Sequence, residues 1–138
     1  MDRATLERVS ELRLCDAEAL LAAGRWDAAY YLLGYVVECA LKACVAKRFR
    51  LHEVPERKLL SVFYTHDLDE LLRASEVKSE FDRNAKVNPG VAFNWNIVLD
   101  WSPDARYDVN KTESQARELY TAVTDCDSGV WTWLKTQY

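Results

Sequence analysis

Residues 26–49 read WDAAYYLLGYVVECALKACVAKRF and carry apolar side chains at steps of three and four positions. This spacing is that of an α-helix, and it places a continuous apolar face along the segment. The face consists of Trp26, Ala29, Tyr30, Leu33, Val37, Ala40, Leu41 and Cys44. Because Leu32, Val36 and Val45 widen this face, we expect the helix to be the most buried element of the protein.

Long segments near the two ends of the chain also predict helices. Apolar residues recur at helical steps over residues 6–21, and Gly24 ends that pattern. The same spacing returns over residues 112–134, which predict one long last helix. Thr112 and Gln115 have the spacing of a capping box at its start.

The middle of the chain is less regular. Pro55 lies in a polar linker, and residues 67–74 then predict a short helix with Thr65 near its N-cap. Residues 76–84 add a further helical turn or two before the pattern breaks. The apolar run over residues 93–101 fits a strand, a short helix or a packed aromatic loop, because so short a run shows no clear period.

The composition agrees with a helical protein. The chain has 138 residues, which suits a single domain covering residues 1–138. Four glycines and three prolines are too few for the many tight turns of a β-sandwich or barrel. Three long helices and one or two short ones predict an all-α fold, an up-and-down bundle of four to five helices. The net charge of −4 differs from the strongly basic surface of a dedicated nucleic-acid binder, although residues 47–58 carry a local excess of positive charge.

No segment has the features of a signal peptide or a transmembrane helix. The longest apolar run, residues 30–37, is under half of the ~20 residues that cross a bilayer. The four cysteines show no CxxC spacing, and Cys39 and Cys44 lie about 140° apart on a helix, too far to bind one metal ion. We therefore expect a cytoplasmic protein with reduced thiols and with no metal, cofactor or membrane partner.

A narrow polar seam interrupts the apolar helix. Asp27, Tyr31, Gly34, Glu38 and Lys42 fall within about 80° of its circumference. Glu38 precedes Lys42 by one turn, the orientation that favours an ion pair. Gly34 in mid-helix costs up to about 1 kcal/mol relative to alanine, which suggests a close approach by another element. The seam faces solvent, a second copy of the chain, or a ligand cleft.

Several short motifs follow one another in the order of a known family. They are Ala23-Gly24-Arg25-Trp26-Asp27-Ala28-Ala29-Tyr30-Tyr31, Glu38-Cys39-Ala40-Leu41-Lys42-Ala43, Thr65-His66-Asp67-Leu68 with Leu71-Leu72, and Ala105-Arg106-Tyr107 after Trp101. Over residues 10–135 the chain thus resembles the HEPN superfamily (higher eukaryotes and prokaryotes nucleotide-binding domain), in its small stand-alone prokaryotic form. The resemblance implies a bundle of four to five helices, often a homodimer. It also implies a metal-independent ribonuclease, a non-catalytic partner of a small nucleotidyltransferase, or an inert scaffold, commonly in toxin–antitoxin or phage-defence systems.

The catalytic members of this family use an arginine followed, after four to six intervening residues, by a histidine. The histidine serves as acid and base for cleavage at a ribose 2′-hydroxyl, and the arginine is a fixed cation for the phosphate. In this chain Arg48 lies too close to His52, Arg57 lies too far before His66, and no histidine follows Arg106. We therefore expect a protein that lacks the usual ribonuclease pair, with Arg106 and His66 as the catalytic candidates if activity is present.

The candidate binding cleft combines the polar seam with the later motifs. Its residues are Asp27, Tyr31, Glu38, Lys42, His66, Trp101, Arg106 and Tyr107. Its aromatic side chains either stack on a base or plug the bundle or a dimer seam. We expect a homodimeric module that binds a nucleotide or RNA, or that partners a nucleotidyltransferase or an antitoxin. The alternative is an endoribonuclease toxin that uses Arg106 and His66.

Overall fold

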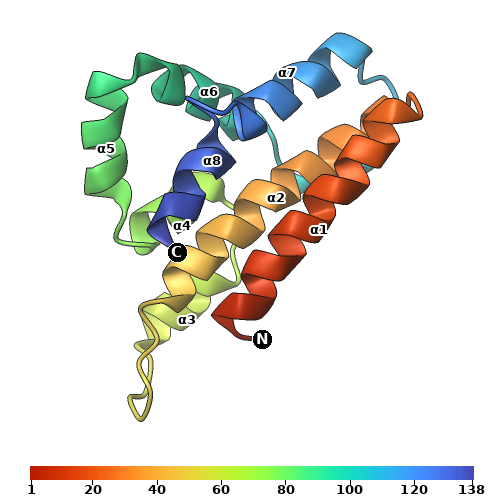
Figure 1. Cartoon of the computed structure of the whole chain (residues 1–138). Helices are drawn as coiled ribbons and strands as arrows, with labels where there is room; N and C mark the ends of the chain where they lie inside the picture. Colours follow the sequence, from red (N-terminus) through yellow and green to blue (C-terminus); the bar gives the residue numbers. More distant parts are fainter.

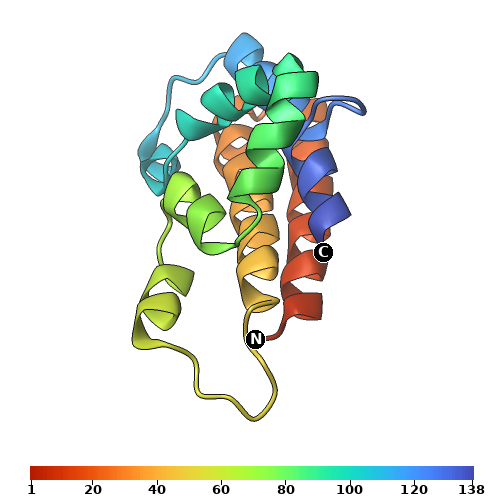
Figure 2. The ribbon, with the colours of Figure 1, turned by 90° about the vertical axis from the view of Figure 1, so that its left-hand side faces the viewer.

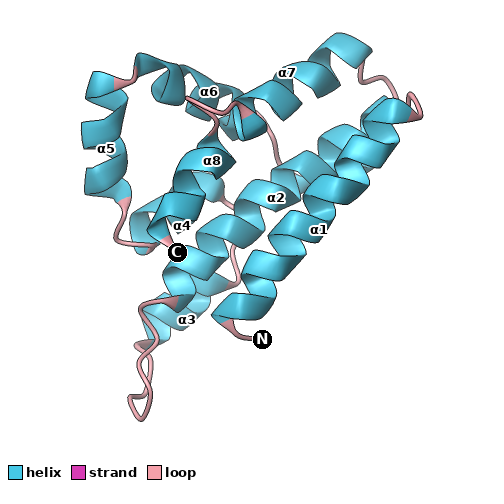
Figure 3. Cartoon of the chain, in the orientation of Figure 1, coloured by secondary structure: helices cyan, strands magenta, loops and turns pink.

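The computed structural model describes residues 1–138, and all of its regular structure is helical (Figures 1 and 3). The prediction of an all-α protein is therefore confirmed. Eight α-helices follow one another, together with two short 3-10 helices, η1 and η2. There are more helices than the four to five expected, because a predicted linker, the ambiguous apolar run and the predicted last helix each contribute an additional one.

The first two helices form a long antiparallel pair (Figure 1). Helix α1 covers Arg3–Ala22 and α2 covers Trp26–Ala46. Asp2 caps α1, since its carboxylate accepts a hydrogen bond from the Thr5 N–H at 2.8 Å. Between the helices Gly24 has a φ of +71°, a left-handed conformation that glycine adopts without steric cost. Both helices lie where the apolar spacing predicts them.

Helix α2 is the centre of the core, as predicted. Twelve of its residues are buried, and α1, α4, α7, α8 and η1 pack against it. By length and composition α2 is apolar enough to cross a membrane, but 67% of its most apolar window is buried inside the protein. Packing on several sides thus accounts for its apolar character.

Two short helices follow on one side of α2. Helix α4 covers Leu68–Ala74, which confirms the predicted short helix, and Asp67 is its N-cap because the carboxylate accepts the Glu70 N–H at 3.0 Å. Helix α3 covers Arg57–Phe63, where only a polar linker is predicted. None of its residues is fully buried, although Leu59 and Phe63 pack against the core, and seven residues are too few to show a clear helical period.

The ambiguous apolar run is helical. Helix α5 covers Lys78–Val87 and α6 covers Pro89–Leu99. Pro89 occupies the first turn of α6, where its missing N–H costs nothing. The buried residues of α6 lie three and four positions apart, at Val91, Asn94, Trp95 and Val98. This period becomes visible only when the helix start at residue 89 is known.

The rest of the chain crosses one end of the α1–α2 pair and returns along it (Figure 1). It forms η1 (Pro103–Tyr107), α7 (Glu113–Thr124), α8 (Val130–Leu134) and η2 (Lys135–Gln137). The predicted capping box of Thr112 is present at the start of α7. Figure 2 shows η1 and α4 on the same side of α2.

The prediction of one continuous helix over residues 112–134 is wrong. The chain turns after Thr124, where the Asp125 carboxylate accepts the N–H groups of Asp127 and Ser128, both at 2.9 Å. A Cβ on Gly129 would lie 2.6 Å from the Asp125 backbone, so only glycine fits the end of this turn. The apolar spacing continues across the break because α7 and α8 face the same core.

Candidate functional site

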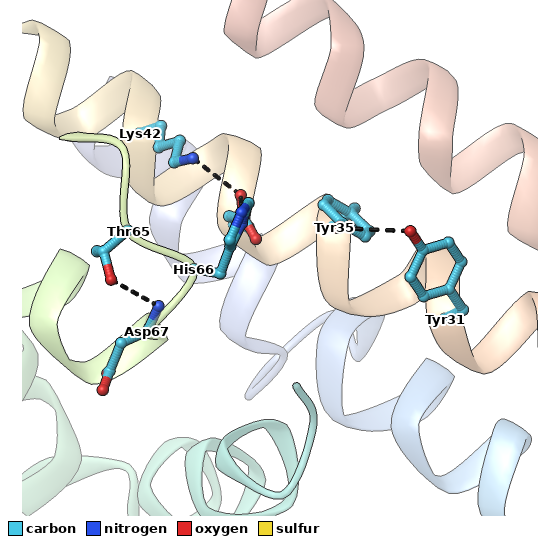
Figure 4. Close-up of polar contacts among 7 residues, drawn as sticks. Tyr31, Tyr35, Lys42, Thr65, His66 and Asp67 are labelled. Carbon is cyan, nitrogen blue, oxygen red and sulfur yellow. Dashed lines mark hydrogen bonds and ion pairs between the residues drawn. The ribbon is translucent and has the colours of Figure 1, made fainter. Parts of the chain in front are cut away.

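A buried carboxylate lies within the polar seam of α2. Only 4% of the Glu38 side chain is exposed. Its Oε1 accepts a hydrogen bond from Lys42 Nζ at 2.9 Å and lies 2.9 Å from His66 Nδ1 (Figure 4). Its Oε2 is buried and has no hydrogen-bond partner in the chain. The predicted pair between Glu38 and Lys42 is therefore present, but it lies inside the protein and is shared with a histidine.

His66 reaches Glu38 from the turn that precedes α4. In this turn the Asp67 N–H donates to Thr65 Oγ1 at 3.2 Å, and the Asp67 carboxylate caps α4. The turn directs one face of the imidazole toward α2, while 54% of the His66 side chain remains exposed. His66 thus has an inner nitrogen held by a buried carboxylate and an outer nitrogen, Nε2, with no bond to the chain.

Gly34 provides the close approach that its position in mid-helix predicts. A Cβ at Gly34 would lie 1.8 Å from the ring of Trp101, so the indole lies directly on the backbone of α2. Trp101 Nε1 donates a hydrogen bond to the Tyr31 carbonyl at 3.2 Å, and only 4% of the residue is exposed. Of the two roles considered for Trp101, the structure therefore supports the packing plug, because its buried faces offer no surface to a base.

Two tyrosines continue the seam beyond Glu38. Tyr31 Oη donates to Tyr35 Oη at 3.4 Å (Figure 4). The Tyr35 ring packs edge-on against the rings of Trp101 and His66. Burial, followed by the hydrogen bond with Tyr31, raises the pKa of Tyr35 above its usual value, and the charge of Arg106 acts in the opposite direction. Tyr35 is therefore a neutral phenol near neutral pH, and its ring lies beside that of His66.

An open hollow of about 450 Å³ lies beside His66. Its walls come from the turn before α4, the end of α6 and the start of η1. The lining residues are Thr65, His66, Asp67, Leu68, Leu99, Trp101, Ser102 and Pro103. The volume falls within the usual range for small-ligand sites, and the lining combines apolar surface with a few polar groups.

Arg106 lies on η1 and is free of ionic partners. Its guanidinium lies 4.8 Å from the ring centre of Tyr107, and it forms no salt bridge or hydrogen bond with another side chain. Tyr107 is 71% exposed, which leaves a face of its ring available to a partner. Arg106 and Tyr107 therefore form an exposed cationic and aromatic pair on the same side of α2 as the hollow.

The structure brings some of the eight predicted cleft residues into contact and separates Asp27 from them. Glu38, Lys42 and His66 are in contact, and Tyr31 adjoins them through Tyr35. Asp27 lies about 16 Å along the helix axis from Glu38. Its carboxylate accepts the Lys111 N–H at 2.7 Å, which fixes the loop before α7. Of the three surroundings considered for the seam, open solvent does not apply to its middle, because Trp101 covers Gly34 and His66 covers Glu38.

Tyr35 is the member of the site that the sequence reading missed. On a helical wheel it lies about 20° from Lys42, close enough to belong to the seam. The signal was therefore present, but an aromatic residue within an apolar run is more simply assigned to the core. The hollow also receives hydroxyl groups from Thr65 and Ser102. In the sequence these two residues look like ordinary helix-capping residues, so nothing near them marks a binding site.

Side chains that could bind a metal ion gather in the acidic turn between α7 and α8. Ligand atoms of Asp125, Cys126 and Asp127 lie within 4.8 Å of one another. The N–H groups of Ser128 and Asp127 hold the pKa of Asp125 below its usual value, and the same carboxylate oxygen accepts both. The Asp125 carboxylate therefore stabilises the turn. None of the three residues of this cluster lines the hollow beside His66.

Comparison with protein-family models, with curated proteins and with solved structures finds no match to this chain.

Removing Glu38 tests whether the buried pair supports the fold. We expect Glu38→Ala to lower the free energy of unfolding by about 3 kcal/mol, because the Lys42 ammonium loses its partner in a largely buried place. Glu113→Ala is the matched control, since Glu113 also pairs with a cation one turn later but at the surface. Its loss should stay below about 0.5 kcal/mol. Equal losses in urea denaturation would contradict the burial of the Glu38 pair.

The contact between Gly34 and Trp101 predicts that substitutions at these two positions will not have additive effects on stability. Gly34→Ala should destabilise the protein by about 1–3 kcal/mol, because the new methyl group overlaps the indole. In a Trp101→Ala background the same change should be neutral or stabilising by up to about 1 kcal/mol, since alanine is the better helix former. Urea denaturation of both single variants and the double variant measures the coupling. If Gly34→Ala lowered the free energy of unfolding equally in the wild-type protein and in Trp101→Ala, the indole would not lie on Gly34.

Proposed function

We propose that the protein is a HEPN-like helical-bundle domain that binds a nucleotide or RNA through a phosphate group at the hollow beside His66. In this proposal it is a module without the usual ribonuclease pair, and it acts as a homodimer or as the partner of a nucleotidyltransferase. Its setting is a cytoplasmic toxin–antitoxin or phage-defence system. The family, the dimer and the setting rest on the order of the sequence motifs.

The observation that supports the proposal most directly is the arrangement of His66. A buried carboxylate holds Nδ1, and Nε2 remains free beside a hollow of ligand size. Fixing the imidazole in advance lowers the conformational cost of binding. Arg106 forms no salt bridge, and it lies on η1, the short helix whose first residue, Pro103, lines the same hollow.

Lys42 has a different role from the one first considered. Its ammonium is bonded to Glu38 and lies 5.9 Å from the ring centre of Phe63, with 13% of its side chain exposed. A cation so placed neutralises the buried carboxylate and has little charge left for a ligand. We therefore assign the phosphate contact to Arg106 and His66.

Calorimetric titration tests this proposal. We expect 5′-AMP, 5′-GMP or a short single-stranded RNA to bind, and Arg106→Ala to weaken the interaction about tenfold, the usual effect of losing a charged hydrogen bond. Arg83→Ala is the control, because Arg83 is also exposed but lies on α5 with Glu80 as its partner. Absence of binding by all three ligands would reduce the proposal to protein partnering.

A second candidate function is a metal-independent endoribonuclease that uses Arg106 and His66. The observation in its favour is the buried carboxylate behind His66, because a histidine oriented in this way is suited to general-base catalysis. Arg106 would supply the cation for the phosphate. The two residues come from different elements, which is why the family's short spacing between arginine and histidine does not reveal them.

Incubation with RNA separates the two functions. The binding proposal expects an unchanged RNA pool from the wild-type protein. Cleavage that is lost in both Arg106→Ala and His66→Ala, and kept in His52→Ala, would instead establish the ribonuclease. His52 is a suitable control because it is exposed and forms no hydrogen bond. An adjacent gene for an antitoxin would favour the ribonuclease, and one for a small nucleotidyltransferase would favour the partner module.

A further inference from the structure

The contact between Glu38 and His66 determines which nitrogen of the imidazole carries a proton. Glu38 Oε1 already accepts from the Lys42 ammonium, so the carboxylate is an acceptor at that oxygen. A hydrogen bond at 2.9 Å to the same oxygen requires that Nδ1 of His66 be the donor. Neutral His66 then has its proton on Nδ1 and a lone pair on Nε2.

This tautomer decides what the exposed side of His66 can bind. A lone pair on Nε2 accepts hydrogen bonds from hydroxyl or amino groups, but it offers nothing to a phosphate oxygen, which is also an acceptor. A phosphate can bond to Nε2 only when that nitrogen also carries a proton. Because Nδ1–H is held by Glu38, this second proton makes the ring an imidazolium and must come from solution.

We propose that Glu38 is a positioning residue that holds His66 as the Nδ1–H tautomer, so that the hollow takes up a proton when it binds a phosphate monoester. The inference rests on the proposed function, since it concerns the same hollow and the same ligand chemistry. It adds a condition to that function, because phosphate binding is coupled to the charge of one imidazole.

The charges around His66 determine whether phosphate binding favours or opposes protonation of the imidazole. Glu38 and Lys42 on α2 offset each other, and Tyr35 on the same helix is neutral. Asp67 in the turn before α4 adds a negative charge, and Arg106 on η1 adds a positive one. A bound phosphate dianion then supplies the additional negative charge that favours the imidazolium. Binding therefore strengthens as the pH falls through the range in which histidine takes up a proton.

Nitrogen-15 NMR of the imidazoles tests the tautomer. The chain has two histidines, so the spectrum contains one signal set for His66 and one for His52, which has no hydrogen bond to fix it and serves as the internal control. At a pH where both rings are neutral we expect His66 to be in the Nδ1–H form. In Glu38→Ala this preference should be lost while His52 is unchanged. An Nε2–H form of His66 in the wild-type protein would overturn the proposal, even if the variant does not fold.

Titration with 5′-AMP and with inorganic phosphate between pH 7 and pH 9 tests the proton uptake. The phosphate group of AMP is a dianion throughout this range, so any pH dependence of AMP binding comes from the protein. Inorganic phosphate changes its own protonation near neutral pH and shows only whether the phosphate group alone is bound. We expect the affinity to fall by up to tenfold per pH unit, with an uptake that approaches one proton per site in buffers of different ionisation enthalpy. His66→Gln keeps an N–H donor for Glu38 but cannot be charged, and it should abolish the dependence, whereas His52→Gln should not.

The outcomes separate this inference from the function on which it rests. Binding of AMP with no proton uptake supports the proposed function and overturns the coupling. Failure of 5′-AMP, 5′-GMP, the short RNA and inorganic phosphate to bind overturns the phosphate-binding function and the coupling together. In that case an Nδ1–H tautomer in the spectrum would still support the positioning role of Glu38.

Discussion

The most buried helix of this protein carries a charged carboxylate, and the chain has to supply partners for it. Moving an ion such as Glu38 out of water costs several kcal/mol unless nearby charges and hydrogen bonds offset the loss. Lys42 comes from the next turn of α2, and His66 comes from the turn before α4, so one local and one distant residue share the task. The docking of α4 on α2 is thus tied to the same carboxylate that orients the exposed imidazole.

A second constraint acts one turn earlier on the same helix. The absence of a side chain at Gly34 lets Trp101 lie on the backbone of α2, and this contact fixes the start of η1. Arg106 follows five residues later on that short helix. A glycine that costs helix stability therefore anchors the segment that leads into η1, and the cost is offset by the area of the buried indole. The polar seam is best understood as the surface to which α4 and η1 attach.

The elements that the sequence predicts well are those encoded in neighbouring residues. The apolar spacing of α1 and α2 and the capping box before α7 depend on residues within one or two helical turns. The break between α7 and α8 was missed because both helices face one core, so their apolar spacing continues through a turn that contains a single glycine. The contact between Glu38 and His66 joins positions 28 residues apart, which no local pattern encodes.

The burial of Lys42 also limits which cations of the protein are available to a negatively charged ligand. With a net charge of −4, the protein as a whole repels a phosphate, so attraction has to arise over a few ångströms at the site itself. Lys42 is neutralised by Glu38, which leaves Arg106 as a permanent cation and His66 as a conditional one. In the proposed function, these two groups come from separate elements, so an anion can contact both only when α4 and η1 are docked on α2. Correct packing of the core is therefore a condition for the chemistry of the hollow, because the same three residues, Gly34, Glu38 and Trp101, serve both.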